Sequence, residues 1–224
     1  MEWATLEVRR EGSVGWIIFD RPDAGNAIDA SMFTELERAW STMEADDEVK
    51  VIVNTGNGRA FQTGLDVVQL AQDREALRES SRRTRNFTLR MTGWHCGVTK
   101  PVIAAVNGTC AGGGLHFVAD ADLVIAAEGA TFLDPHVSVG QVSAFETTGL
   151  LKKAPAEAVL RMAVLGREER MSAPRAHQLG IVGEVVPDAE LRARAGSMAE
   201  ALAAEPADAL AAVKAAAWAR LESP

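Results

Sequence analysis

The alternation of short apolar runs with segments of helical periodicity constrains the fold of this chain more than any other feature. Residues 14–19 (VGWIIF) are apolar on both alternating faces, which is typical of a β-strand covered on both sides, and residues 21–23 (RPD) end the run. From Asp29, a residue suited to N-cap a helix, apolar residues follow at spacings of 3, 4 and 3: Phe33, Leu36, Trp40 and Met43. The sequence therefore predicts a strand followed by a helix that packs on the same sheet.

The same cycle repeats along the chain and indicates an α/β protein. The pattern predicts strands at 49–53, 102–106 and 123–126, and helices at 74–92 and 115–119. The last third is mostly helical, with Pro187 and Pro206 between segments, where proline is tolerated best. We expect helices there at 156–165, 173–179, 190–204 and 207–221, and a brief apolar run at 181–186.

Length and charge limit the possible partners. A chain of 224 residues with 47% hydrophobic content can bury one substantial core, so one domain is expected. A net charge of −8, from 31 acidic and 23 basic residues, argues against nucleic acid or an anionic membrane as partner. The apolar runs are shorter than the roughly 18 residues of a membrane span, and no export signal opens the sequence. We expect a cytoplasmic protein that binds a small molecule.

The two cysteines do not form a recognisable site. Cys96 and Cys110 lie fourteen positions apart, with no CxxC pattern and no clustered histidine. A zinc site or a disulfide framework is therefore not expected, and we predict no bound metal.

Two glycine-rich loops, at 57–66 and 107–114, each follow a predicted strand. Neither contains the Gly-Lys-Ser/Thr of a phosphate loop or the GxGxxG of a dinucleotide site. Glycines at the mouth of a helix let backbone N–H groups approach a ligand oxygen, so the two loops could bind one oxyanion. The alternative is that Gly112 to Gly114 only allow close helix packing.

The order of the motifs closely resembles that of the crotonase (enoyl-CoA hydratase/isomerase) superfamily, over about residues 3 to 190. The matching segments are 21–27 (RPDAGNA), 59–66 (RAFQTGLD), 100–114 (KPVIAAVNGTCAGGG), 121–122 (AD) and 130–132 (ATF). The helical tail also fits the family, although it is shorter than is usual there.

This resemblance implies a crotonase-like (ClpP/crotonase) fold, with two roughly perpendicular β-sheets surrounded by helices, and a trimer or a dimer of trimers. Family members bind a thioester or related carbonyl and stabilise its oxyanion with two backbone N–H groups, which by motif position are those of Leu65 and Gly113. Coenzyme A is then part of the substrate, and no other cofactor is implied. The positions that match its binding site are Arg21, Ala24, Ala60 and Asp66, of which Asp66 is expected mainly to hold the first oxyanion loop.

The sequence departs from the family at both catalytic glutamates. Histidines, His116 and His136, stand at these positions, and their separation of twenty residues is retained. Imidazole can act as general acid or base near neutral pH, since its unperturbed pKa is about 6.5. His116 also opens a predicted helix, where the dipole favours the neutral base form. The alternative for each histidine is an ordinary capping or solvated residue.

Glu146, the two other histidines and the segment around His136 also need an interpretation. Glu146 lies where some family members place an acidic group, and it either orients His136 or is an ordinary helix-start carboxylate. His95 and His177 match no family site and are taken as structural. Residues 131–136 (TFLDPH) are similar to 6-oxocamphor hydrolase, which cleaves β-diketones without CoA, but Phe145 stands where that enzyme has an aspartate.

Three hypotheses follow. In the first, the chain binds an acyl-CoA or related carbonyl, polarises it with the Leu65 and Gly113 N–H groups, and moves protons with His116 and His136. The second is CoA-independent hydrolysis of a β-diketone C–C bond, and the third is a non-catalytic crotonase-fold binding subunit. We expect a crotonase core over residues 1–190 and, in the same domain, a helical trimerisation region over 191–224, giving a homotrimer or hexamer.

Overall fold

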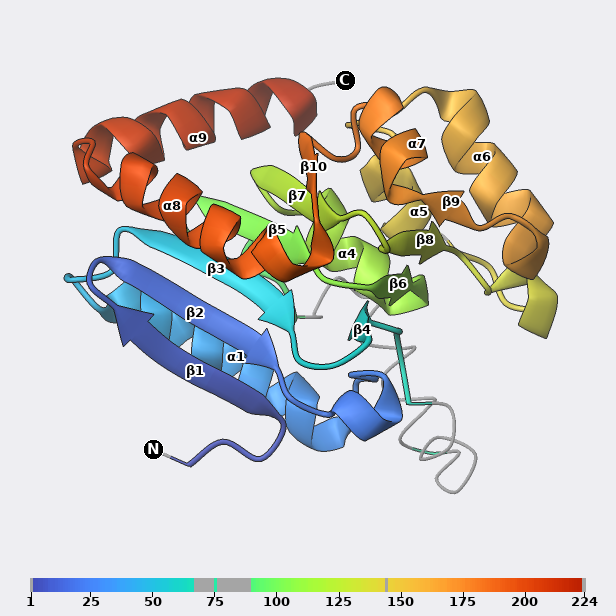
Figure 1. Cartoon of the computed structure of the whole chain (residues 1–224), viewed down its shortest axis with the longest axis horizontal. Helices are drawn as coiled ribbons and strands as arrows, with labels where there is room; N and C mark the ends of the chain where they lie inside the picture. The colour runs from blue at the N-terminus through green and yellow to red at the C-terminus, as the bar shows by residue number, and fades with distance from the viewer. Residues whose placement is uncertain (1, 67–74, 76–89, 144, 223–224) are drawn as a thin grey trace.

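The computed structural model describes residues 2–66, 75, 90–143 and 145–222. It contains two β-sheets with helices around them, as the resemblance implied (Figure 1). None of the described helices is long and apolar enough to span a membrane. The predicted helix at 74–92 lies mostly outside the described residues, and residues 90–92, at its end, are not helical.

The larger sheet has six strands in the order β1-β2-β3-β5-β7-β10. Strands β1 and β2 pair antiparallel, and the other neighbours pair parallel. The strands are β1 (Leu6–Glu11), β2 (Val14–Phe19), β3 (Val51–Gly56), β5 (Val102–Val106), β7 (Leu123–Ala127) and β10 (Glu184–Val186). The predictions for β2 and β5 are confirmed, β3 begins two residues later than expected, and only the end of the run 181–186 is a strand.

Helices cover both faces of this sheet at β2 (Figure 1). A Cβ added to Gly15 would lie 2.5 Å from Met43 of α1 (Ala30–Ala45). The next residue, Trp16, points the other way, and its Cζ2 would lie 3.6 Å from a Cβ added to Gly196 of α8 (Leu191–Ala203). Since consecutive strand residues face opposite sides of a sheet, α1 and α8 must lie on opposite faces. This double cover explains why β2 is apolar throughout.

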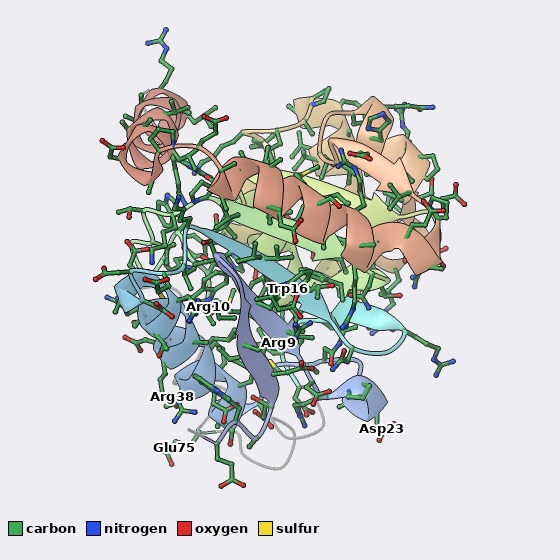
Figure 2. All side chains as sticks on the ribbon, turned by 60° about the vertical axis from the view of Figure 1, so that its left-hand side comes forward. Arg9, Arg10, Trp16, Asp23, Arg38 and Glu75 are labelled. Carbon is green, nitrogen blue, oxygen red and sulfur yellow. The ribbon has the colours of Figure 1, made fainter. Side chains whose placement is uncertain are left out.

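Figure 2 shows Trp16 between the sheet and α8, with Arg9 of β1 beside it. The Arg9 guanidinium lies 5.3 Å from the Trp16 ring centroid. Residues 191–224, predicted as a trimerisation region of the same domain, begin with α8, whose Leu191 and Ala195 are buried in the core. The role of this region in assembly stays a prediction.

The smaller sheet has four strands in the order β4-β6-β8-β9, namely β4 (Ala60–Gln62), β6 (Thr109–Ala111), β8 (Thr131–Leu133) and β9 (Met171–Ser172). These strands were not predicted, because two or three residues are too few to show a periodicity. The six-residue strand β1 was not predicted either. Within the described residues, the remaining helices of at least five residues are α4 (Leu115–Ala119), α5 (Phe145–Leu150), α6 (Ala156–Leu165), α7 (Ala173–Gln178) and α9 (Ala207–Glu222).

The N-cap prediction for α1 is confirmed, because the Asp29 carboxylate accepts a hydrogen bond from Met32 N at 2.8 Å. Of the expected apolar face, Leu36, Trp40 and Met43 are buried, and Phe33 is half-buried. The short helices α4 and α5 contact each other, and they carry two of the candidate site residues, His116 on α4 and Glu146 on α5.

Candidate active site

Asn26 joins the loop after β2 to the first glycine-rich loop, at 57–66. Its Nδ2 donates to Ala60 O at 2.8 Å and to Asn57 O at 2.9 Å, and its Oδ1 accepts from Arg21 N. The residue is fully buried and has a φ of 58°, a left-handed conformation that asparagine tolerates better than most residues. Sequence reasoning quoted Asn26 as part of a motif but missed this role.

Arg21 and Asp66 hold each other. Arg21 Nη2 lies 3.0 Å from Asp66 Oδ2, its Nε lies 3.3 Å from Asp29 Oδ2, and its Nη1 donates to Ala27 O. Asp66 therefore ties the first glycine-rich loop to the loop after β2, and the oxyanion role of that loop stays a prediction. The Arg21 guanidinium already binds these groups of the protein itself, so a role in binding CoA would fall to the rest of this loop. Ala24 is exposed at the end of the single-turn helix η1 (Pro22–Ala24).

The two predicted oxyanion donors lie next to each other. The bridge between Ile28 and Leu65 uses Gly64 O and Asp66 N, so it leaves the Leu65 N–H free of this pairing. A Cβ on Gly64 would lie 2.9 Å from Gly113 N, which shows how closely the two loops pack. Both N–H groups are therefore placed at one loop junction.

The last glycine of the second loop, Gly114, is required by packing. A Cβ on Gly114 would lie 2.2 Å from Gln62 O, a distance that no side chain tolerates. The close packing that one alternative expected is therefore observed at Gly114, and the oxyanion role of this loop stays a prediction. The 3₁₀ turn Gly112–Gly114 leads directly into α4.

His116 and Glu146 meet where α4 and α5 pack together. A Cβ on Gly149 of α5 would lie 2.9 Å from the Ala119 Cβ of α4, so the two helices approach closely. His116 Nε2 consequently lies 3.5 Å from Glu146 Oε1. The His116 side chain is 5% exposed and that of Glu146 is 12% exposed, so the pair is shielded from bulk water.

His136 lies on the other side of the same carboxylate. Its Nε2 is 3.8 Å from Glu146 Oε1, and its Cε1 would lie 3.5 Å from a Cβ on Gly112. The two histidines at the family's glutamate positions therefore face one shared carboxylate beside the oxyanion loops. Glu146, for which two roles stood open, lies between them.

Asp134 holds the second nitrogen of His136. The distance from His136 Nδ1 to Asp134 Oδ1 is 2.5 Å, and Thr147 Oγ1 donates to Asp134 Oδ2 at 2.6 Å. Burial opposes ionisation of Asp134, but hydrogen bonds from His136, Ser143 and Thr147 outweigh it and lower its pKa to about 2. The sequence showed Asp134 only as part of a segment, and its signal was an acidic residue two positions before a candidate histidine.

The carboxylates set the charge of the site. The hydrogen bond to Asp134 raises the pKa of His136, against the effect of burial, and the charge of Glu146 raises it further. Burial alone would raise the pKa of Glu146, but the proximity of His116 and His136 outweighs it and lowers that pKa. Near neutral pH the Nε2–H of a protonated His136 can thus give a proton, and Glu146 is a carboxylate.

His95 also lies in this cluster, although it matches no family site position. Its ring centroid is 5.5 Å from that of His116. Atoms of His95, His116 and Asp120 that could bind a metal lie within 4.8 Å of one another. Thr92 Oγ1 already bonds to both His95 and Asp120, so hydrogen bonding accounts for this group. The other histidine taken as structural, His177, bonds to Val182 O through Nδ1.

Comparison with known proteins decides the family. A profile described as enoyl-CoA hydratase/isomerase matches residues 9–224. The chain belongs to the enoyl-CoA hydratase/isomerase family. A probable enoyl-CoA hydratase of Rhodobacter capsulatus is 34% identical over 225 residues, covering 100% of this chain and 85% of that protein. The carnitinyl-CoA dehydratase of Salmonella enteritidis is 34% identical over 220 residues, covering 94% of this chain and 78% of the relative.

Solved structures agree with this assignment. An enoyl-CoA hydratase/isomerase from Mycobacterium paratuberculosis has a TM-score of 0.86 at 37% identity, covering 99% of this chain and 84% of that one. An enoyl-CoA hydratase subunit from Geobacillus kaustophilus has a TM-score of 0.88 at 34% identity, covering 100% and 85%. The predicted crotonase fold is confirmed. The local similarity to 6-oxocamphor hydrolase stays a prediction.

Proposed function

We propose that this hydratase/isomerase-family chain is an acyl-CoA enzyme in which His136, His116 and Glu146 transfer protons while the Leu65 and Gly113 N–H groups stabilise an oxyanion. The observation that carries the proposal is the position of Glu146 Oε1, which lies 3.5 Å from His116 Nε2 and 3.8 Å from His136 Nε2. Unrelated solvated histidines would have no reason to share a shielded carboxylate.

The relatives support a CoA thioester as the substrate. Their names include (E)-benzylidenesuccinyl-CoA hydratase, carnitinyl-CoA dehydratase and 4-chlorobenzoyl coenzyme A dehalogenase. The acyl groups in these names differ widely, and the thioester is what they share. An enzyme of this kind supplies two donors for the thioester oxygen and then varies the groups that move protons at the acyl carbons.

The proton path follows from the geometry. A carbonyl oxygen held by Leu65 N and Gly113 N would place the neighbouring carbons near His136, because its ring contacts the Gly112 turn. Protonated His136 can deliver a proton to the substrate. Glu146 can then accept a proton from protonated His116 and pass it to His136. Asp134 fixes the ring with Nε2 facing Glu146 and stabilises the imidazolium, as the buried acid does in other Asp–His pairs.

One observation favours a second candidate, hydrolysis of a β-diketone C–C bond without CoA. The pair formed by Asp134 and His136 is suited to deprotonating a water molecule. The hydroxide oxygen would bond to one carbonyl carbon, the C–C bond would break, and the electron pair would pass to the α-carbon, which takes a proton. A non-catalytic subunit, the third hypothesis, would not need this arrangement.

A ligand screen separates the three hypotheses. We would measure the thermal shift with CoA, acetoacetyl-CoA and a cyclic β-diketone, since a ligand at about 100 times its Kd stabilises a protein by roughly 2.7 kcal/mol. Stabilisation by acetoacetyl-CoA followed by turnover of an acyl-CoA supports the first proposal. A response to the diketone alone would replace it with the second, and binding of CoA compounds without turnover of any would favour the third.

We also propose that the chain assembles as a homotrimer or hexamer. Large apolar side chains are exposed on α6 and on α9, including Leu160 (56%), Val164 (68%) and Val213 (69%). Isolated exposed residues are ordinary, but neighbours one turn apart on a helix, such as Leu160 and Val164, form a continuous apolar surface. A second copy of the chain would cover it.

A further inference from the structure

His95 is positioned so that its ring borders His116. The two rings lie at 63° to each other with centroids 5.5 Å apart, and His116 Nε2 lies 3.5 Å from Glu146. The His116 side chain is only 5% exposed, so its neighbours determine which way the ring faces. His95 is one of those neighbours.

A network of hydrogen bonds holds His95 from behind. Thr92 Oγ1 donates to Asp120 Oδ2 at 2.8 Å and lies 2.7 Å from His95 Nδ1. Asp120 follows directly after α4, and its N–H donates to His116 O at 2.9 Å. The network therefore begins at the His116 backbone, passes through Asp120 and Thr92 to His95, and returns to the His116 ring.

The same network fixes the tautomer of His95. A threonine hydroxyl has one proton to donate, and Thr92 gives it to Asp120. Thr92 Oγ1 must then accept from His95 Nδ1, so that nitrogen carries the proton. A neutral His95 consequently has a bare lone pair on Nε2.

The surroundings of His95 also keep its ring neutral. Burial lowers the pKa of His95, Asp120 opposes this effect, and the positive charges of His116 and Lys152 add to the lowering. A neutral ring beside His116 does not compete for the protons that His116 and His136 exchange with Glu146.

We propose that Thr92 and Asp120, acting through the His95 ring, position His116 toward Glu146, so that His95 is a positioning residue of the active site. The proposal rests on the proposed function only in assigning proton transfer to His116. Its structural part concerns the orientation of two rings and can be tested without a substrate.

The first test is ¹⁵N NMR of the imidazole rings, which four histidines in the chain make practical. We expect His95 to show a protonated Nδ1 and an unprotonated Nε2 between about pH 7 and pH 8. In Thr92→Val this preference is lost and the His116 ring signals move. In Thr92→Ser, which keeps the hydroxyl, both return. An exposed control, Thr34→Val on α1, should change neither.

The second test is turnover of an acyl-CoA substrate. Thr92→Val should lower kcat about 10- to 100-fold with little change in KM, since a misplacement of 1 Å can cost about 10²-fold, and Thr92→Ser should restore it. A protonated Nε2 on His95, or unchanged His116 signals and kcat in Thr92→Val, would overturn the proposal. If the wild-type protein turns over no acyl-CoA, the proposed function fails, and the NMR result still decides the positioning network.

Discussion

Replacing Asp134 with asparagine tests whether the Asp134–His136 pair is built as the structure shows. Asp134 is fully buried, and its contacts lower its pKa from 3.8 to about 2. Each pKa unit corresponds to 1.36 kcal/mol, so the ionised carboxylate contributes about 2 kcal/mol to the free energy of unfolding. The substitution should lower Tm by about 4 to 8 °C, because 1 kcal/mol shifts Tm by about 2 to 4 °C in a domain of this size.

The sign of the pH dependence gives a sharper test. A carboxylate whose folded pKa is lowered contributes stability above its unfolded pKa and loses it as the pH falls through the folded value. The difference in unfolding free energy between the wild-type protein and Asp134→Asn should be largest near pH 5, because the raised pKa of His136 also depends on Asp134, and its contribution to stability is present below the unfolded histidine pKa of about 6.5 and is lost as the pH rises through the folded value. The difference should shrink between about pH 4 and pH 2.

Urea denaturation at several pH values measures this difference, with Asp23→Asn as the matched control. Asp23→Asn removes the same charge, but Asp23 is exposed on η1 at the edge of the molecule (Figure 2). NMR titration of His136 adds an independent readout, since its raised pKa should fall when the Asp134 charge is removed. Equal stability of Asp134→Asn and Asp23→Asn at pH 7, with an unchanged His136 pKa, would show that Asp134 and His136 do not form this pair.

Three further predictions concern the site and the assembly. Gly113→Pro should abolish turnover in a protein that still assembles, because proline removes the N–H assigned to the oxyanion. Gly113→Ala, which keeps this N–H, is the control. Near wild-type turnover in Gly113→Pro would show the assignment to be wrong. Glu146→Gln should lower kcat about 10- to 100-fold and move the His136 inflection of the pH–rate profile to lower pH, since the Glu146 charge raises that pKa; an unmoved inflection would exclude this coupling. Light scattering should show a trimer or hexamer, and a monomer at micromolar concentration would remove the assembly proposal.

The sequence predicted those strands and helices whose pattern of apolar residues matches the faces that they bury. The apolar run of β2 and the spacing along α1 follow directly from burial on two faces and on one face, and both are observed. The strands of the smaller sheet were missed because each has only two or three residues and therefore shows no periodicity of its own. The strand β4, for example, is three residues long and pairs with β6, almost fifty residues later.

The candidate site was predicted by motif position, and its internal contacts were not. Leu65 and Gly113 were paired through the resemblance, and the structure places their loops together. The roles of Asp134 and Asn26, and the place of His95 beside His116, depend on side-chain directions set by tertiary packing. A sequence without its fold contains no such information, which is why His95 was taken as structural.

Proton transfer by the imidazoles is tested by the kcat of His136→Ala on the acyl-CoA identified by thermal shift. We expect kcat to fall about 10²- to 10⁴-fold with a smaller change in KM, and His136→Gln to be no more active, because an amide cannot accept the proton. The wild-type pH–rate profile should show an inflection above about pH 6.5, where the raised pKa of His136 places it, and not near pH 4 to 5. Wild-type kcat in a variant carrying both His116→Ala and His136→Ala would contradict the account and make Glu146 the next candidate.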